Sequence, residues 1–324
     1  MRKDLFGSIK KTFIKIVKES LQTGWGLTKI MVPILILTKV LQEFGAVTFL
    51  GKLLNPLMGW VRLPGGMALV WAMAILISPY GGLILYASLA SQYPLTAAQT
   101  TVLAALILMA HAMPLEIRIA QKAGLRVSLQ LLLRVGGAFL FGWLLHQFYS
   151  LTGYLQTPSQ AVFNITQEDP TWLGWAWAQV KNLGTTYLII FSLLSLMEIL
   201  DKLGILNIFK RLLEPLLRLM GMSKEAAPIT IIGITLGLGL GGGLVIQEAK
   251  SGRMEKKDIF FSLVLMCLFH SLIEDTIVML MMGAHLSGIL WARLIFSFGV
   301  VFLMVKIVNL LPQKLYDRYI RTVS

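Results

Sequence analysis

The chain has 324 residues, of which 56% are hydrophobic and only 14% charged, and its mean hydropathy is +0.74. This composition excludes an ordinary soluble domain and indicates an integral membrane protein. The net charge of +13 does not by itself indicate nucleic-acid binding, because membrane proteins collect Lys and Arg in their cytoplasmic loops.

Residues 1–24 predict an amphipathic helix. Phe6, Ile9, Phe13 and Ile16 recur at helical spacing, and lysines lie between them. No long apolar stretch followed by a small-residue cleavage site is present, so the pattern does not fit a removed leader peptide. We therefore expect a helix that lies in the membrane interface.

The rest of the chain predicts an internal duplication. A shift of 159 residues places Gly45 on Gly204, His111 on His270, Gly124 on Gly283 and Arg134 on Arg293. Any two apolar helices share leucines, but matches of the rarer His, Gly and Arg at one offset indicate a repeat. The predicted parts are repeat one (25–150), an outer linker (151–182), repeat two (183–311) and a cytoplasmic tail (312–324).

Each repeat contains the same segments in the same order. An apolar segment (25–49 or 183–203) precedes a short amphipathic piece and then an apolar stretch that is broken near its centre. Two further apolar segments follow, at 97–117 with 127–149 in repeat one and at 258–281 with 288–311 in repeat two. Because a spanning helix needs about 20 apolar residues, we expect three transmembrane helices per repeat.

The positive charges predict the topology of the broken stretch. Lys and Arg flank the second broken stretch on both sides, so both of its ends are expected in the cytoplasm. This favours a re-entrant hairpin with arms of about eleven residues, which reach about the middle of the bilayer. A discontinuous helix that spans the membrane fully is the alternative. With hairpins, each repeat crosses the membrane three times, so the second repeat is expected to be inverted.

The predicted fold class is an all-α integral membrane protein with two inverted repeats, each with three transmembrane helices and a re-entrant or broken helical hairpin. The amino terminus, the 118–128 loop, both flanks of the second hairpin and the carboxyl terminus hold most of the Lys and Arg residues. We therefore expect both termini in the cytoplasm and the protein in the plasma (inner) membrane. The expected partners are the lipid bilayer and a small-molecule or ion substrate, without nucleic acid; a homo-oligomer is left open.

Ionisable residues inside the apolar segments mark the candidate site. His111 and Glu116 lie in repeat one, and His270, Glu274 and Asp275 lie in repeat two. Inserting a charged side chain at the centre of a spanning helix costs on the order of 2.5 to 3.5 kcal/mol, so such residues indicate a structural or functional role. His270 and Glu274 are four residues apart and are expected to share a helix face. We predict one polar centre that binds substrate, a proton or another cation; the alternative is that these groups only hold the helices together.

The hairpin tips supply further candidate contacts. Exposed backbone amides at such a tip can hold an anion, and carbonyls can hold a cation. Arg134 and Arg293 are expected either to reach the lipid head groups or to face Glu116 and Asp275. The candidate substrate or ion contacts at the tips are Ser78, Gly81, Gly82, Gly241, Gly242, Gly243 and Gln247.

The stretches HAMPLEIRIAQKAG (111–124) and HSLIEDTIVMLMMG (270–283) resemble the nucleoside recognition, or Gate, domain. The resemblance covers about 30–145 and 189–304. This domain is found in concentrative-type nucleoside transporters, in spore maturation membrane proteins and in the membrane part of ferrous iron transport protein B. The resemblance implies a paired, inverted Gate fold with hairpins, and it leaves the substrate open.

Three functions are compatible with these patterns. The leading prediction is a permease for a small polar solute, nucleoside-like or an organic anion, coupled to protons or sodium. The second is a pathway for a divalent metal, for which Met266 and Cys267 add ligand types. The third is a membrane scaffold that transports nothing. No cofactor is expected. An enzymatic function is not expected either, because HSLIED lacks the second His of a zinc-protease helix.

Overall fold

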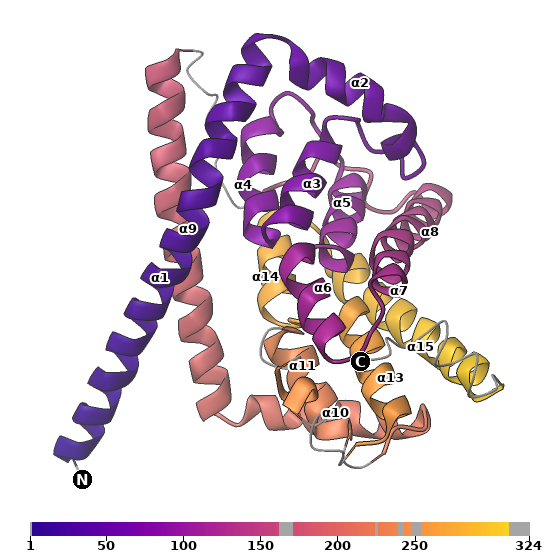
Figure 1. Ribbon diagram of the computed structural model, residues 1–324. Helices are drawn as coiled ribbons and strands as arrows, with labels where there is room; N and C mark the ends of the chain where they lie inside the picture. Colours follow the sequence, from indigo (N-terminus) through magenta and orange to yellow (C-terminus); the bar gives the residue numbers. More distant parts are fainter. Residues whose placement is uncertain (1, 162–170, 224–225, 239–242, 248–253, 311–324) are drawn as a thin grey trace. The chain divides into compact units, whose positions relative to one another are not determined.

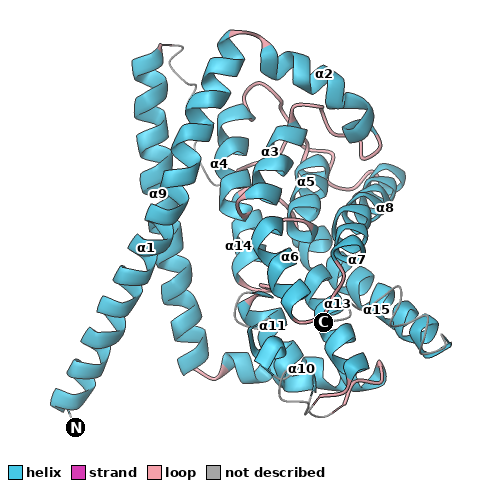
Figure 2. Ribbon diagram, in the orientation of Figure 1, coloured by secondary structure: helices cyan, strands magenta, loops and turns pink. Residues whose placement is uncertain are grey.

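The computed structural model describes residues 2–161, 171–223, 226–238, 243–247 and 254–310. Helices form nearly all of its regular structure (Figures 1 and 2), and one isolated β-bridge joins Thr96 and Pro158. This confirms the predicted all-α class. The chain divides into two compact units, residues 1–49 with 164–205 and residues 50–163 with 206–324.

The first unit consists mainly of α1 (Arg2–Glu43) and α9 (Trp172–Lys202), which pack against each other (Figure 1). Gly24 permits their close approach, because a β-carbon at this position would lie 2.4 Å from the ring of Tyr187. The hydroxyl groups of Thr28 and Tyr187 are hydrogen-bonded at 3.1 Å. These two hydroxyls belong to residues that are 159 positions apart.

Two predicted boundaries in this unit differ from the observed helices. α1 continues through residue 24 without a break, so the proposed interfacial segment and the first apolar segment form one helix. α9 begins at Trp172, eleven residues before the predicted start of repeat two at residue 183. Thr171 caps α9 by accepting a hydrogen bond from the Gly174 amide, which explains this earlier start.

The second unit contains most of the remaining helices. In repeat one they are α2 (Ala46–Gly59), α3 (Met67–Leu76), α4 (Pro79–Leu89), α5 (Ala97–Met109), α6 (Met113–Lys122), α7 (Val127–Leu131), the π-helical η1 (Leu132–Gly136) and α8 (Gly137–Thr152). In repeat two they are α10 (Ile205–Leu219), α11 (Ala226–Leu236), α13 (Lys256–Leu268), α14 (Glu274–Met281), the π-helical η2 (Ser287–Ala292) and α15 (Arg293–Leu310).

The helices of the two halves begin and end at related positions. α5 and α13 differ by 159 residues at both ends, and the starts of α2 and α10 differ by the same number. The offset of 159 residues that aligns the two halves of the sequence therefore also relates the bounds of these helices. The repeats as a unit of architecture, and the inversion of the second one, stay predictions.

The first broken stretch forms two short antiparallel arms, α3 and α4, that pack against each other (Figure 1). The Ser78 hydroxyl accepts a hydrogen bond from the Gly81 amide and caps α4. A β-carbon at Gly82 would lie 3.0 Å from the Ala74 β-carbon, so glycine allows the arms to approach closely. In the second broken stretch α11 ends before Gly237, whose φ is +93°.

The helices that carry the two predicted histidines are also broken. In repeat one, Pro114 lies between His111 and Glu116 and can open the helix there, whereas no proline or glycine predicts a break in repeat two. α5 ends before His111, and α13 ends before His270. Ala112 and Ser271, the residues that follow these histidines, have φ of 45° and 49°. The prediction that His270 and Glu274 share a helix face is therefore wrong, because His270 lies in the break and Glu274 begins the next helix.

Among the described residues, four helical stretches are long and apolar enough to cross a membrane: 97–122, 127–152, 172–202 and 287–308. They correspond to four of the six predicted crossings. The other two predicted crossings fall on α1 and on the interrupted pair α13 and α14. The protein is thus an all-α membrane protein with several candidate spans, and the total of six crossings stays a prediction.

Candidate functional site

A buried polar centre lies within the second unit, where the breaks after α5 and α13 place His111 and His270. Exposed fractions are 3% for His111, 1% for His270, 8% for Glu116 and 5% for Asp275. Glu116 lies in the first turn of α6, and Asp275 lies in the first turn of α14. The structure therefore brings together four of the five ionisable residues that the sequence predicted for one centre.

The two imidazole rings face each other at the centre. Their Nε2 atoms are 3.0 Å apart, and the ring centroids are 4.8 Å apart. His111 Nδ1 lies 3.0 Å from the Ile107 carbonyl oxygen, and His270 Nδ1 lies 2.6 Å from the Met266 carbonyl oxygen. Because a carbonyl oxygen can only accept, each Nδ1 carries the proton and donates it. Each Nε2 therefore directs a lone pair at the other ring when both rings are neutral.

Two carboxylates flank the imidazole pair. Glu116 Oε1 lies 3.2 Å from His270 Nε2 and 3.6 Å from His111 Nε2. Asp275 Oδ2 lies 3.4 Å from His111 Nε2, and within the described structure this buried oxygen has no hydrogen-bond partner. The centre thus presents two nitrogen and two oxygen acceptors at short mutual distances.

Arg134 forms a buried ion pair with Glu116. Its Nε donates to the Met109 carbonyl at 3.1 Å, and its Nη2 donates to the His111 carbonyl at 2.8 Å. The side chain is fully buried, so it does not reach the lipid head groups. Of the two roles expected for Arg134, the one opposite Glu116 is therefore observed.

Arg293 is fully buried too, and its observed partners are backbone carbonyls. It donates to the carbonyls of Leu268 at 3.2 Å, His270 at 3.2 Å and Leu108 at 3.3 Å. No ion pair within 4.0 Å joins it to Asp275 in the described part of the chain, so the expected role opposite that acid stays a prediction. The carbonyls at the broken end of α13 accept its other N–H groups, and its Nη1 has no hydrogen-bond partner among the described residues.

Both arginines thus cap the ends of broken helices. A helix that ends inside the protein leaves its last carbonyls without N–H partners, and these carbonyls form the negative end of the helix dipole. A guanidinium group offers five donors in a planar fork, which suits several carbonyls at once. The π-helical segment η1 contains Arg134, and η2 immediately precedes Arg293. These local π-turns are common at functional sites.

Glu274 has a different role from the other predicted acids. It is partly exposed, and its Oε1 accepts a hydrogen bond of 2.7 Å from the Tyr80 hydroxyl. This bond links the second arm of the first hairpin, α4, to α14. The sequence analysis missed Tyr80, although it lies between the predicted tip residues Ser78 and Gly81.

The predicted tip residues do not join this cluster directly. Ser78 caps α4, while Gly81 and Gly82 face side chains of α3 and allow the two arms to pack closely. Gly243 and Gln247 are exposed, in contrast to the buried centre. Gly241 and Gly242 lie outside the described residues. A substrate contact at any of these tips stays a prediction.

The two sulfur-bearing residues next to His270 offer little to a central ligand. The Met266 sulfur occupies the space beside Gly233, only 1.8 Å from where a β-carbon would stand, so this thioether packs against α11. Cys267 is a buried free thiol. The described residues that could hold one ion together are instead His111, His270 and Asp275, whose ligand atoms lie within 4.8 Å of one another.

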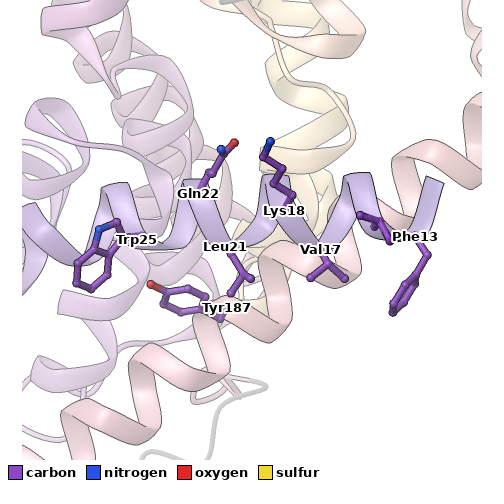
Figure 3. Close-up of a pocket in the computed structure, with 8 residues that line it drawn as sticks. Phe13, Val17, Lys18, Leu21, Gln22, Trp25 and Tyr187 are labelled. Carbon is purple, nitrogen blue, oxygen red and sulfur yellow. The ribbon is translucent and has the colours of Figure 1, made fainter. Parts of the chain in front are cut away.

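An open groove lies in the first unit, between α1 and α9 (Figure 3). Its volume is about 630 Å³, and it is lined by Phe13, Ile14, Val17, Lys18, Leu21, Gln22, Trp25 and Tyr187. The lining is mainly apolar and contains a single ionisable group from the basic face of α1. Such a groove suits the acyl chains of the bilayer, so the better candidate for a specific site is the polar centre of the second unit.

Comparison with known proteins places the second half of the polar centre in a recognised domain. Residues 183–285 match the family of Gate domains, described as nucleoside recognition. Residues 183–285 are therefore similar to Gate domains. The matched residues include His270, Glu274 and Asp275, and the match confirms the predicted resemblance for the second half of the chain. The first predicted repeat, with His111, lies outside the matched residues.

The chain is also similar to the uncharacterized membrane protein YvoD of Bacillus subtilis (strain 168). The two are 26% identical over 290 residues, which cover 88% of this chain and 91% of YvoD. No solved structure matches the chain significantly. The Gate domain and this relative agree with the apolar helices in assigning a multi-pass membrane protein.

Proposed function

We propose that the protein is a secondary transporter for a small polar solute, either nucleoside-like or an organic anion. Transport is coupled to a proton or another cation that binds at the centre formed by His111, His270, Glu116 and Asp275. The description of the Gate domain as nucleoside recognition makes nucleosides the first class to test. The protein acts as a carrier and not as an enzyme.

The observation that carries this proposal is the 3.0 Å approach of the two Nε2 atoms. With both Nδ1 atoms donating to carbonyls, two neutral rings would point lone pairs at each other, which is repulsive. A cation between the rings, either a proton or a metal ion, turns this repulsion into attraction. A buried place that requires a cation is what a cation-coupled carrier needs at its centre.

The surrounding helices support a transport role. Interrupted helices at membrane depth are tolerated where they line a cavity or are buried in protein, and such helices are typical of the binding sites of secondary transporters. The Tyr80 to Glu274 hydrogen bond connects a hairpin arm to the helix that carries Asp275. Because the centre is buried, a solute gains access only when these elements move.

The location of the protein follows from its charge pattern. We place it in the plasma (inner) membrane with both termini in the cytoplasm, because Lys and Arg are concentrated in the segments expected on that side. Under this arrangement the proton gradient across the membrane is available to drive uptake.

The test is uptake by purified protein in liposomes, with labelled uridine as the nucleoside probe and labelled succinate as the organic-anion probe. We expect accumulation of at least one probe that depends on an imposed proton or sodium gradient. His111→Asn and Asp275→Asn should each lower the initial rate about tenfold or more, since each removes a group that holds the coupling cation.

His146→Asn is the matched control, because this histidine lies on α8 outside the centre and its replacement should leave the rate unchanged. The proposal is wrong if neither probe accumulates above the level of empty liposomes. Unchanged rates in both centre variants would equally contradict it. A protein that inserts and folds normally but transports neither probe would support the scaffold interpretation.

A further inference from the structure

We propose that His111, His270 and Asp275 bind one divalent ion of a first-row transition metal. The three ligand atoms are the two imidazole Nε2 atoms and one carboxylate oxygen, and they all lie within 4.8 Å of one another. Binding itself follows from this geometry alone. The further assignment of the ion as the cation that drives transport rests on the proposed function.

The first argument is the fixed orientation of both rings. Each Nδ1 donates to a backbone carbonyl of the helix that ends just before the histidine, at Ile107 and Met266. Metal-binding histidines almost always donate their other ring N–H in this way, because the bond fixes the tautomer and makes the free nitrogen a better ligand. Both Nε2 lone pairs are thereby presented to the same point.

The second argument is the spacing of the ligand atoms. A tetrahedral ion with bonds of about 2.0 to 2.1 Å holds neighbouring ligand atoms about 3.3 Å apart. The observed separations are 3.0 Å between the two Nε2 atoms, 3.4 Å between His111 Nε2 and Asp275 Oδ2, and at most 4.8 Å for the remaining pair, His270 and Asp275. An ion therefore fits between these atoms once the Asp275 carboxylate moves toward His270.

The third argument is the state of the Asp275 carboxylate. Its Oδ2 is buried and lacks a hydrogen-bond donor within the described structure. An unpaired carboxylate oxygen is costly at such a position, and it requires either a donor or a cation. A metal ion shared with His111 and His270 supplies that cation, whereas a proton held between the two imidazoles leaves this oxygen unpaired.

The charges around the centre permit a cation. Its ionisable neighbours are Arg134 and Arg293 on one side and Glu116, Glu274 and Asp275 on the other. The formal balance is negative when all three acids are ionised. Arg134 engages Glu116, so that acid is a weaker ligand than Asp275.

The donor types select the class of ion. Two imidazoles and one carboxylate suit zinc, cobalt, iron or manganese, whereas magnesium and calcium prefer oxygen ligands alone. Three protein ligands leave a fourth position open. Under the proposed function, this open position is where a polar group of the solute would contact the ion.

The test is a titration of the full-length protein in detergent micelles with cobalt(II), followed by its visible absorption bands. The protein is purified with an affinity tag that contains no histidine. We expect one equivalent to bind with the intense bands of low-coordinate cobalt, and a chelator should reverse them. His111→Asn and His270→Asn should weaken binding about tenfold or more, because loss of an outer-shell group alone costs that much.

His146→Asn and His285→Asn are the controls, since they remove the two histidines outside the centre and should leave the titration unchanged. X-ray absorption by the cobalt-loaded wild-type protein should show two imidazole ligands. If a centre variant fails to fold, the X-ray absorption spectrum of the wild-type protein still tests whether two imidazoles bind the ion.

Absence of cobalt binding by the wild-type protein would overturn the metal site, as would a titration that the centre variants leave unchanged. Gradient-driven uptake without cobalt binding would then assign a proton to the imidazole pair and leave the proposed function standing. Cobalt binding without uptake of either probe would support the metal site and contradict the proposed function.

Discussion

Arg134 and Arg293 are the largest fully buried side chains in the described part of the molecule. A buried guanidinium needs partners for its donors, and both side chains use their Nε and Nη2 groups on backbone carbonyls freed by helix breaks. Arg134 Nη1 pairs with Glu116, whereas Arg293 Nη1 has no hydrogen-bond partner among the described residues. The histidines owe their orientation to the same breaks, because each Nδ1 bonds a carbonyl one turn earlier. At the residue scale, the centre is therefore organised by backbone groups as much as by side-chain pairs.

Removing Arg134 tests this view. Arg134→Met leaves the buried Glu116 carboxylate unpaired and two carbonyls without donors. We expect a loss of about 3 to 5 kcal/mol in the free energy of unfolding, which is typical when one partner of a buried ion pair is removed. Thermal unfolding in detergent gives the measurement. The double variant with Glu116→Leu should lose less than the sum of the two single changes.

Arg118→Met is the control for this experiment, because Arg118 is exposed and its hydrogen bond in the described structure is to the Gln121 side chain. Its effect should stay within about 0.5 kcal/mol. Equal losses for the Arg118 and Arg134 variants would show that the buried network contributes little to stability.

At the element scale, the unit of construction is the short half-helix. α3, α4, α5, α6, α13 and α14 have between 8 and 13 residues, too few for any one of them to cross a bilayer alone. Their broken ends bring polar backbone groups to the depth where the histidines lie. The hairpin arms α3 and α4 must therefore pack closely to bury their apolar side chains. This close packing depends on glycine at position 82.

A larger side chain at Gly82 should disrupt this packing. In Gly82→Val the β-carbon would meet Ala74 at 3.0 Å and Ile107 at 3.3 Å, which forces α4 away from α3. We expect a loss of about 1 to 3 kcal/mol, as for other overpacked sites. Gly299→Val in α15 has open space around its β-carbon and the same helix propensity cost. Similar unfolding temperatures for the two variants would contradict the close packing of the arms.

At the scale of the whole molecule, the prediction to test is the inversion of the second half. The charge pattern predicts that the segment before α5 faces outward and that the segment before α13 faces the cytoplasm. Related histidines in contact across the centre agree with two similar halves that meet there. Labelling from each side of the membrane tests the predicted inversion.

Cysteine accessibility in intact cells provides this test. The chain offers a simple background, because Cys267 is its single cysteine and is buried, so Cys267→Ala removes all thiols. In that background, Ser91→Cys should react with a membrane-impermeant reagent added outside, whereas Glu255→Cys should react only after the cells are opened. Both positions are exposed in the structure. Labelling of both from one side would exclude the inverted arrangement.

Parts of the centre could be predicted from the sequence because they depend on residue type and spacing. The rarity of ionisable residues in apolar segments selected His111, His270, Glu116 and Asp275, and the offset of 159 paired the histidines. The break at His270 was not predicted, since no proline or glycine marks it. Tyr80 was missed because its partner, Glu274, is distant in the sequence.

The sequence by itself determined that this is an all-α membrane protein with a polar centre, because hydropathy and the spacing of rare residues are properties of the chain. Only the tertiary structure decided that the two imidazoles meet nitrogen to nitrogen, that Arg134 pairs with an acid, and that Arg293 bonds carbonyls instead. The physical reason is that these contacts depend on backbone groups released where helices break. Such groups have no signature in the side-chain sequence.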